Sequence, residues 1–536
     1  MPQPQPRTHE PQDTYALSRF VFLRLLGAVY LVAFASLAPQ ITGLVGSHGL
    51  LPAAPYLDWA YSLYGARAYR LLPTLLWFDP SDAALRLVVW AGIVLSALLI
   101  AGVAQRAVLA GLWVLYLSVT TVGQDFLSFQ WDALLLEAGL LAMIWAPGGW
   151  RPGAPEAAPL PAVRWLLVFL LFKLMFLSGV TKLLSGDPTW RHLTALDYHF
   201  ETQPLPPWTA WYAHHQPVGL HRVATAGMFT IELAAPWLMF APPRLRALRY
   251  GAVAALAVLQ AAIALTGNYG FFNLLAVVLC VPVLDDRAFR RILPVGRGSE
   301  RQEAGAWRAM VTAMVPLLFL LSGISVFAEM AYTLPDGRGA ALVPRWATAT
   351  LSAAAPFRSI NGYGLFRVMT TERPEIVVEG SADGEHWQEY EFRYKPGPVA
   401  RRPPFVEPLH PRLDWQMWFA ALAPVNNLPL LRALAQRLKA GAPEVLTLLG
   451  RNPFPTAPPR SVRFAIYDYR FTTPDERKRT GAWWERELAG YLPEVEDAAL
   501  SPPIRNNGMP AEADTPLRFR VGPVSYLRMS TITRTR

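Results

Sequence analysis

Residues Phe126–Pro147, with the sequence FLSFQWDALLLEAGLLAMIWAP, form a nearly continuous apolar block that nevertheless carries Gln130, Asp132 and Glu137. A charged side chain at the centre of a lipid-embedded helix costs about 2.5 to 3.5 kcal/mol, so such side chains normally face protein or water and find partners. The block therefore predicts a membrane helix that turns its polar side chains toward other helices. There they are expected to close a polar network near the outer surface.

The apolar character of this block extends over much of the chain. Hydrophobic residues make up 53% of the 536 residues, charged residues make up only 16%, and there are 19 tryptophans. Long apolar blocks follow one another as far as Phe327, whereas the sequence beyond Thr333 is mixed, Pro-rich and charged. Because a helical crossing needs about 20 apolar residues, the composition predicts a polytopic membrane protein.

Nine apolar blocks are candidates for membrane crossings, and the fourth and eighth are short for a span. The first block also contains ASLA, which would suit cleavage of a secretory signal, but its length and Arg24 favour a retained helix. The expected crossings are Phe20–Ala38, Leu85–Ala104, Ala107–Val122, Phe126–Ala146, Val163–Leu184, Arg222–Ala241, Leu245–Thr266, Tyr269–Leu284 and Met310–Phe327.

The formal net charge of +10 follows the loops and does not indicate a nucleic-acid partner. With a cytoplasmic N-terminus and nine crossings, the cytoplasmic loops receive most of the arginines between crossings, among them Arg106, Arg164, Arg249 and those in residues 287–308. This is the asymmetry of the positive-inside rule. It predicts a C-terminal part outside the cytoplasm, beyond a bacterial inner membrane or, in a eukaryote, inside the endoplasmic reticulum.

The C-terminal part is predicted to be an α+β domain with an antiparallel sheet. Residues 375–394 alternate as two strands around a tight turn at Asp383 and Gly384. Residues 461–471 form another strand, 428–449 have helical periodicity, and 481–492 are predicted as a short helix. The expected parts are a disordered N-terminus (1–18), a multi-pass helical domain (19–330), an exported domain (335–500) and a disordered tail (501–536). The single cysteine, Cys280, lies in an apolar block, so disulfide exchange with a client is excluded.

Three ionisable residues, Glu137, Lys173 and Glu232, lie inside predicted crossings. Buried charges are normally paired, so one interpretation is a structural ion pair or hydrogen-bonded knot among these helices. The other interpretation is a functional polar cavity. Which acid pairs with Lys173 stays open at this point.

Lys182 ends its predicted helix on the outer side, and two interpretations apply to it. Its flexible stem can extend the amine to the membrane interface. Alternatively, it lines an outward-facing cavity with Asp125 and Asp132, where a desolvated lysine can act as a base. Nearby, Asn268 and Asn273 flank the entrance of the eighth crossing, and we expect their amides to bond to the polar face of the fourth helix.

The long loop after Lys182 contains four histidines whose spacing matches no familiar metal-ligand motif. The tryptophans and the tyrosine among them instead predict an aromatic segment at the membrane surface. The sequence contains no nucleophile elbow, phosphate loop or dinucleotide fingerprint, so no metal, cofactor or standard enzyme class is predicted. The histidines are His192, His199, His214 and His215.

Several long motifs resemble the lipase maturation factor family. They are FLSFQWDALLLEAG (126–139), KLLSGDPTWRHLTALDYHFETQPLPPW (182–208), NYGFFNLLAVVLCVPVLDD (268–286), NGYGLFRVMTTERPEIVVEGSADGEHWQEYEFRYKPG (361–397), HPRLDWQMWFAAL (410–422) and NPFPTAPPRSVRFAIYDYRF (452–471). The resemblance implies a polytopic membrane protein whose vertebrate relatives reside in the endoplasmic reticulum and help dimeric lipases, such as lipoprotein lipase, reach their active form. It also implies lipase contact through the C-terminal domain, here about 335–471.

A shorter stretch, GVTKLLSGDPTW (179–190), is similar to the vitamin K-dependent gamma-carboxylase and its bacterial membrane relatives. In those proteins a lysine at the place of Lys182 serves catalysis. This resemblance implies an alternative: an intramembrane enzyme, or a protein that binds lipid or quinone, with an outward-facing pocket around Lys182, Asp125, Asp132 and Glu137.

The leading hypothesis is a maturation factor that is not an enzyme and needs no cofactor. Its partners would be membrane lipids and a secreted lipase or other exported client protein. Trp387, Trp415 and Trp418 would supply contact area for the client, because tryptophan is a favoured anchor at interfaces. The same three tryptophans are equally suited to the core of the domain or to its docking onto the membrane.

Overall fold

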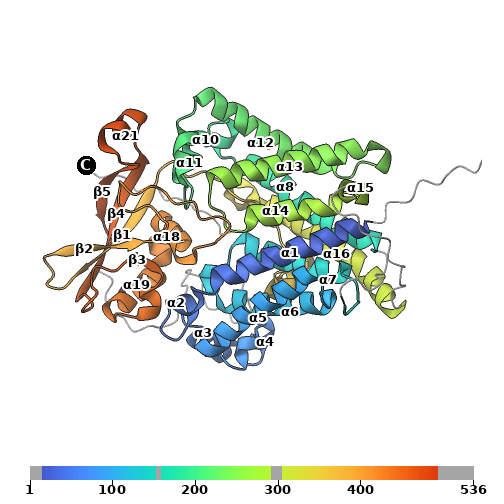
Figure 1. The fold of residues 1–536 in the computed structure, drawn as a ribbon, viewed down its shortest axis with the longest axis horizontal. Helices are drawn as coiled ribbons and strands as arrows, with labels where there is room; N and C mark the ends of the chain where they lie inside the picture. Colours follow the sequence, from blue (N-terminus) through green and yellow to red (C-terminus); the bar gives the residue numbers. More distant parts are fainter. Residues whose placement is uncertain (1–14, 152–158, 291–304, 493–536) are drawn as a thin grey trace, which may run out of the picture.

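The apolar blocks of the N-terminal part fold into long helices that lie side by side (Figure 1). The computed structural model describes residues 15–151, 159–290 and 305–492. Within these ranges, six helices are long and apolar enough to cross a membrane, which makes the chain a polytopic helical membrane protein. They are α1 (Ala16–Leu37), α5 (Asp82–Ala101), α6 (Gln105–Val122), α8 (Pro161–Leu184), α13 (Arg246–Thr266) and α16 (Gly305–Thr333).

The predicted count of nine crossings is larger than these six. The fourth predicted crossing forms α7 (Gln130–Trp145), which has only 16 residues, and the eighth forms α14 (Phe272–Cys280), which has 9. The sixth forms α12 (Val218–Leu238), which is long enough at 21 residues but contains polar residues and is not among the six. Short length and internal polarity therefore distinguish these three helices from a typical lipid-exposed span.

Neighbouring helices in the chain are mostly neighbours in the bundle. α1 packs against α5, α5 against α6 and α6 against α7, while α8 packs against α7, α12 and α16, and α14 returns to α1. Short elements connect them: α2 (Ile41–Val45), α3 (Ala53–Tyr64), α4 (Arg67–Leu71), η1 (Leu75–Trp77), η2 (Gln124–Leu127), α9 (Pro188–Arg191), α10 (Leu196–Thr202), α11 (Trp208–His214), η3 (Pro243–Leu245), η4 (Val281–Val283) and α15 (Asp286–Phe289).

The expected disordered ends are only partly covered by the structure. Helix α1 begins at Ala16, so residues 16–18, predicted as part of a disordered N-terminus, are helical. Residues 1–14 of that prediction and the predicted tail, residues 501–536, lie outside the described residues.

The C-terminal part contains the predicted antiparallel sheet, with the strand order β3-β2-β1-β4-β5. Helix α18 (Arg412–Leu422) packs against β1, between the sheet and the helix bundle (Figure 1). The strands are β1 (Pro374–Ser381), β2 (Trp387–Phe392), β3 (Leu449–Arg451), β4 (Ser461–Phe471) and β5 (Trp484–Tyr491), and the remaining helices are η7 (Val425–Asn427), α19 (Leu428–Lys439), α20 (Pro443–Leu446) and α21 (Pro474–Thr480).

Two local predictions for this part are wrong. Residues 481–492 were expected to be a short helix, but they form β5, in which Trp484 pairs with Phe471 of β4 and packs in an aromatic cluster with it. Pairing with a neighbouring strand thus overrides the local helical pattern. The turn at Asp383 and Gly384 is also wider than a tight hairpin, because the pairing of β1 with β2 ends at Ser381 and the loop spans 382–386.

One hydrophobic core joins the bundle and the sheet. The same cluster of buried side chains runs from Tyr30 in α1 through Trp131 in α7 and Trp415 in α18 to Val378 and Phe464 in the sheet. The two parts that differ so clearly in composition therefore pack as one structure.

The chain between α16 and the sheet also stays beside the bundle. After α16 it forms η5 (Pro335–Leu342), α17 (Arg345–Ala354) and η6 (Ala355–Phe357). Val343 and Ala347 pack against α16. Farther along, Asn361 and Tyr363 hydrogen bond to Glu137 in α7. Residues just beyond the change in composition at Thr333 thus lie among the helices of the bundle.

Candidate functional site

The first buried ion pair joins the fourth apolar block to the C-terminal part. Asp132, in the first turn of α7, has no exposed surface. Arg412, the first residue of α18, donates to both carboxylate oxygens of Asp132, at 2.6 Å from Nη1 and 2.8 Å from Nη2. The Tyr116 hydroxyl in α6 donates to the same carboxylate at 2.6 Å. This pair connects α6, α7 and α18 at a point where both charges are removed from water.

A second buried pair lies deeper in the bundle. Glu137 in α7 accepts a hydrogen bond from Nζ of Lys173 in α8, which settles the partner that the sequence left open. The second oxygen of Glu137 accepts from Asn361 at 3.1 Å and from the Tyr363 hydroxyl at 2.7 Å. Lys173 also donates to the backbone oxygen of Asn361 at 3.0 Å. We call Asp132, Glu137, Lys173, Asn361, Tyr363 and Arg412 together the docking network.

Lys182 belongs to a third pair. Its amine lies 2.9 and 3.0 Å from the two carboxylate oxygens of Glu232 in α12, and 5.3 Å from the ring centre of Trp190. The predicted pocket of Lys182 with Asp125 and Asp132 is not formed, because Asp132 binds Arg412 and Asp125 lies exposed in η2. Asp132 and Glu232 are thus each paired with one cation, Arg412 and Lys182 respectively.

The two asparagines hold a loop of the C-terminal part. Asn268 donates to the backbone oxygen of Pro404 at 3.0 Å and accepts from the backbone N–H groups of Val406 and Glu407. Asn273, in α14, donates to the Glu407 carboxylate at 3.0 Å. The prediction that these amides bond to the polar face of α7 is therefore corrected. Their partners are buried or half-buried polar groups of a loop that has no regular backbone pairing of its own.

Gln130, the remaining amide of the fourth block, also bonds to the chain beyond α16. Its Oε1 accepts from the backbone N–H of Gly364 at 3.4 Å. All the polar side chains that the sequence placed in this helix thus have partners beyond residue 170, which explains why a short membrane helix retains them.

Glu407 is expected to make docking of the C-terminal part pH-dependent. Burial raises its pKa to about 7 from the ordinary 4.5, although hydrogen bonds from Asn273 and the Tyr269 N–H oppose the shift. Because the folded state holds this proton more tightly than the unfolded state, the stabilising contribution of Glu407 is complete below about pH 4.5 and is lost as the pH rises through about 7.

Thermal unfolding of the detergent-solubilised protein, followed from pH 5 to 8, tests this. We expect the melting temperature of Glu407→Gln minus that of the wild type to increase as the pH rises. Glutamine keeps the acceptor for Asn273 but does not titrate. Buried His410, whose pKa is lowered by burial, acts in the opposite direction but equally in both proteins. Parallel curves for the two proteins would contradict the assignment.

Of the three tryptophans predicted to contact a partner, two are buried inside the protein. Trp415 packs against Trp131 of α7 with ring centres 5.0 Å apart, and the Trp418 indole donates to the backbone oxygen of Thr202 at 2.9 Å. For these two residues the prediction of partner contact is corrected, because docking onto the bundle covers them. Trp387 in β2 is half-buried, and the Arg463 guanidinium lies 4.0 Å from its ring centre.

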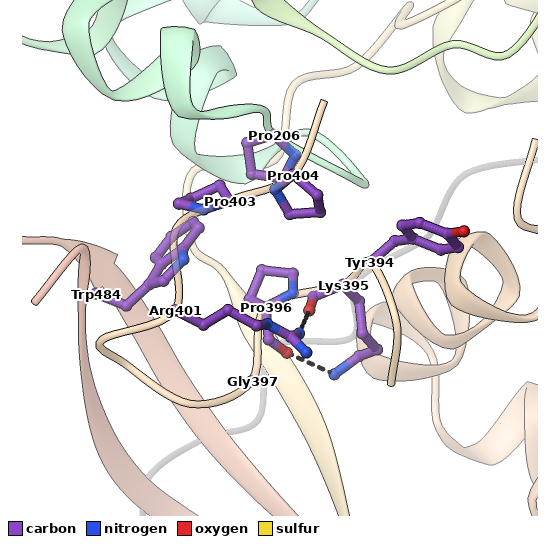
Figure 2. Close-up of a pocket in the computed structure, with 9 residues that line it drawn as sticks. All are labelled: Pro206, Tyr394, Lys395, Pro396, Gly397, Arg401, Pro403, Pro404 and Trp484. Carbon is purple, nitrogen blue, oxygen red and sulfur yellow. Dashed lines mark hydrogen bonds between the residues drawn. The ribbon is translucent and has the colours of Figure 1, made fainter. Parts of the chain in front are cut away.

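A small pocket lies where the loop after α10 meets the C-terminal part (Figure 2). Its empty volume is about 200 Å³. Both cations in its wall are occupied: Lys395 lies 2.8 Å from Glu375, and Arg401 donates to the backbone oxygen of Lys395 at 2.5 Å. The cations in its wall are therefore engaged within the protein, and the pocket lies at a junction between loops. Its lining consists of Pro206, Tyr394, Lys395, Pro396, Gly397, Arg401, Pro403, Pro404 and Trp484.

The histidines of the long loop have separate surroundings. His199 lies 3.1 Å from the Tyr269 hydroxyl, whereas His215 lies 2.7 Å from the backbone oxygen of Trp211. In the ranges that the structure describes, no group of three or more histidine, cysteine, aspartate or glutamate residues is arranged to hold a metal ion.

The sequence alone does not identify four residues of the site: Tyr116, Asn361, Tyr363 and Arg412. Asn361 and Tyr363 lie in NGYG, and Arg412 lies in HPRLDW, both within motifs that carry the resemblance stated above. Their position beyond the change in composition assigned them to an exported domain. The signal for Arg412 is the need of Asp132 for a cation, which directs the search to arginines and lysines elsewhere in the chain.

The fold and the docking network define a class: a polytopic helical membrane protein whose C-terminal sheet domain is fixed to the bundle by a buried ion pair and by hydrogen bonds. Two family models match the chain, the lipase maturation factor transmembrane domain over residues 17–291 and the lipase maturation factor C-terminal domain over residues 359–493. The chain belongs to the lipase maturation factor family.

Individual relatives match over almost the whole chain. Human lipase maturation factor 2 is 37% identical, with 92% of this chain and 85% of the relative covered. Lipase maturation factor 1 of Bos taurus is 34% identical, covering 90% and 89%, and human lipase maturation factor 1 is 32% identical, covering 94% and 92%. No solved structure matches the chain.

Proposed function

We propose that this protein is a membrane-anchored maturation factor that assists the folding or assembly of exported lipases or other exported proteins. The observation that carries the proposal is the match to lipase maturation factors 1 and 2 over about nine-tenths of the chain. The names of these relatives state a role in lipase maturation. The pairing of Lys182 with Glu232 favours a structural role for the lysine and a protein that acts without enzymatic chemistry of its own.

We further propose that α7, α12 and α14 complete a nine-pass topology. Tyr15, Arg164, Arg249 and Asp285 gather at one end of the bundle, where α1, α8 and α13 begin and α14 has ended. At the opposite end, Ser36 of α1 bonds to His410. Helix α7 starts beside Arg412 at that opposite end and is followed by α8, so it carries the chain back. Helix α12 likewise carries the chain back between α8 and α13, and α14 does so between α13 and α16.

The arginine-rich end is then cytoplasmic by the positive-inside rule. The C-terminal domain lies outside the cytoplasm, in the periplasm if the membrane is a bacterial inner membrane and in the lumen if it is that of the endoplasmic reticulum. An exported client would meet the domain there. The bundle and the docking network hold the sheet in place. Strand register puts Trp387 and Arg463 on the face of the sheet opposite to buried Val378 and Phe464, and this face is available to a partner.

Deletion of the gene in its native host tests the proposal. We expect the specific activity of exported lipases to fall, while the amount of lipase messenger is unchanged, and the wild-type gene to restore it. Specific activity is measured as ester hydrolysis divided by lipase protein on an immunoblot. Trp387→Ala is expected to restore activity poorly although the protein accumulates normally. Equal specific activity with and without the gene would overturn the proposal.

A further inference from the structure

The chain after α16 contacts membrane helices far from their ends. Ser359 accepts a hydrogen bond from the Trp113 indole at 3.0 Å, and the backbone oxygen of Asn361 accepts from Lys173 at 3.0 Å and from Ser325 at 3.1 Å. These partners lie on three helices, and Glu137 on α7, which accepts from the Asn361 amide, adds a fourth. Residues 359–361 are therefore enclosed by the bundle at depth.

The depth follows from helix geometry. Lys173 lies about 17 Å from either end of α8, and Trp113 lies about 13 Å from either end of α6, at 1.5 Å per residue. The hydrocarbon core of a bilayer is about 30 Å thick. A residue that bonds to the middle of both helices lies near the midplane of the membrane, well below the surface on which the C-terminal domain rests.

The path into and out of the membrane is visible in the packing on α16. Val343, Ala347 and Leu351 of the α17 segment pack against residues 324–331 of α16, so α17 descends along it. The ten residues of α17 cover about 15 Å, which is half the hydrocarbon thickness. Arg367 then bonds to Thr333 and Glu329, close to the outer end of α16, at 3.3 Å each. The chain thus enters and leaves on the same side.

The non-helical backbone of residues 359–364 has the hydrogen-bond partners that a membrane interior requires. Non-helical backbone is tolerated at such depth only where protein or water covers it. Here Lys173, Ser325 and Gln130 bond to the backbone of Asn361 and Gly364. The polar side chains of the membrane helices therefore serve in part as bonding partners for a segment that dips between them.

The exposed side of α17 and of the residues that flank it is an apolar stripe. Leu342, Trp346 and Phe357 expose 56%, 61% and 42% of their surface, and exposed Ala349 and Ala353 lie between them at helical spacing. The neighbouring α16 exposes Leu317, Leu320 and Phe327. The stripe thus continues the lipid-facing surface of a membrane helix, and lipid acyl chains are the occupant that fits both its chemistry and its depth.

We propose that residues 335–367 form a re-entrant hairpin that reaches the midplane of the membrane, with the stripe from Leu342 to Phe357 against lipid acyl chains. The exported domain then begins only after Arg367, later than the change in composition suggests. This inference rests on the membrane fold and is independent of any lipase client.

Spin labels on the full-length protein in phosphatidylcholine nanodiscs test the hairpin. In a Cys280→Ala background, single cysteines replace Leu342, Trp346, Ala349, Ala353 or Phe357, one at a time. The readout is the ratio of collision rates with molecular oxygen, which concentrates in lipid, and with a water-soluble nickel chelate. We expect this ratio to rise stepwise from Leu342 to Phe357. Five independent positions keep the test informative if one variant fails to fold.

Two control positions calibrate the scale. Leu320→Cys on α16 reports lipid, and Val425→Cys in the C-terminal domain, 78% exposed, reports water. Ratios at Ala353 and Phe357 that match Leu320 support the hairpin. Nickel accessibility at these positions equal to that at Val425 would overturn it. So would protection from both reagents with dipolar broadening between labels, because a second copy of the chain would then cover the stripe.

Discussion

Arg412→Ala is expected to lower the free energy of unfolding by about 3 to 5 kcal/mol, the cost of leaving a buried charge without its partner. The change removes both hydrogen bonds from the guanidinium to Asp132 and leaves that carboxylate with the Tyr116 hydroxyl. Asp132 has no exposed surface, so its carboxylate depends on protein donors in the intact protein. Thermal unfolding in detergent, followed by tryptophan fluorescence, measures the effect.

A matched control comes from the outer face of the sheet. Arg463 pairs with Glu379 at 2.6 Å, and 31% of the arginine side chain is exposed although Glu379 is buried, so Arg463→Ala should cost less than Arg412→Ala. The double variant Asp132→Leu with Arg412→Leu should recover part of the lost stability, because no unpaired charge remains. Equal losses from Arg412→Ala and Arg463→Ala would show that burial does not determine the strength of the first pair.

The second large effect concerns Glu137 and Lys173, whose partners are unequal. Glu137→Leu leaves the Lys173 amine with the backbone oxygen of Asn361, and we expect a loss of about 3 to 5 kcal/mol. Lys173→Met leaves Glu137 with two donors, Asn361 and Tyr363, so the loss should be smaller. The same unfolding experiment gives the order of the two variants.

The exposed pair of Arg451 and Glu391 in the sheet serves as the control for this comparison. Its arginine side chain is mostly in solvent, and Arg451→Ala should have little effect. A larger loss for Lys173→Met than for Glu137→Leu would mean that the hydrogen bonds from Asn361 and Tyr363 contribute little, and that the lysine alone supports the site.

The sequence predicts the membrane helices and the pairing of their charges well, but it does not identify the partners. That Asp132 and Glu137 must be paired follows from the cost of isolated charges in lipid. That Arg412 pairs with Asp132 and that Asn361 adds a hydrogen bond to the pair of Glu137 and Lys173 does not follow, because Arg412 and Asn361 lie in a region whose composition resembles a soluble domain. The local sequence pattern is also insufficient to predict the structure of residues 481–492, where pairing with β4 determines it.

The predicted count of nine crossings exceeds the six described helices that are long and apolar enough to span a membrane. The helices α7 and α14 are shorter than a typical span, and most of their side chains are buried in protein. Both helices are apolar, so their length and not their hydropathy separates them from the six. The same enclosure allows Gln130 and Asn273 to occupy helices at membrane depth.

The wide separation of Asp132 and Arg412 along the chain has a consequence for biosynthesis. The ribosome adds about 5 to 20 residues per second, and 280 residues separate the two, so the aspartate waits for its cation on the order of tens of seconds. Lys173, by contrast, follows Glu137 after only 36 residues. The deeper pair can therefore close while the nascent bundle is still being inserted. The shallower pair can close only after Arg412 has been translated, about three-quarters of the way along the chain, so a protein that assists the maturation of others completes its own docking late in its synthesis.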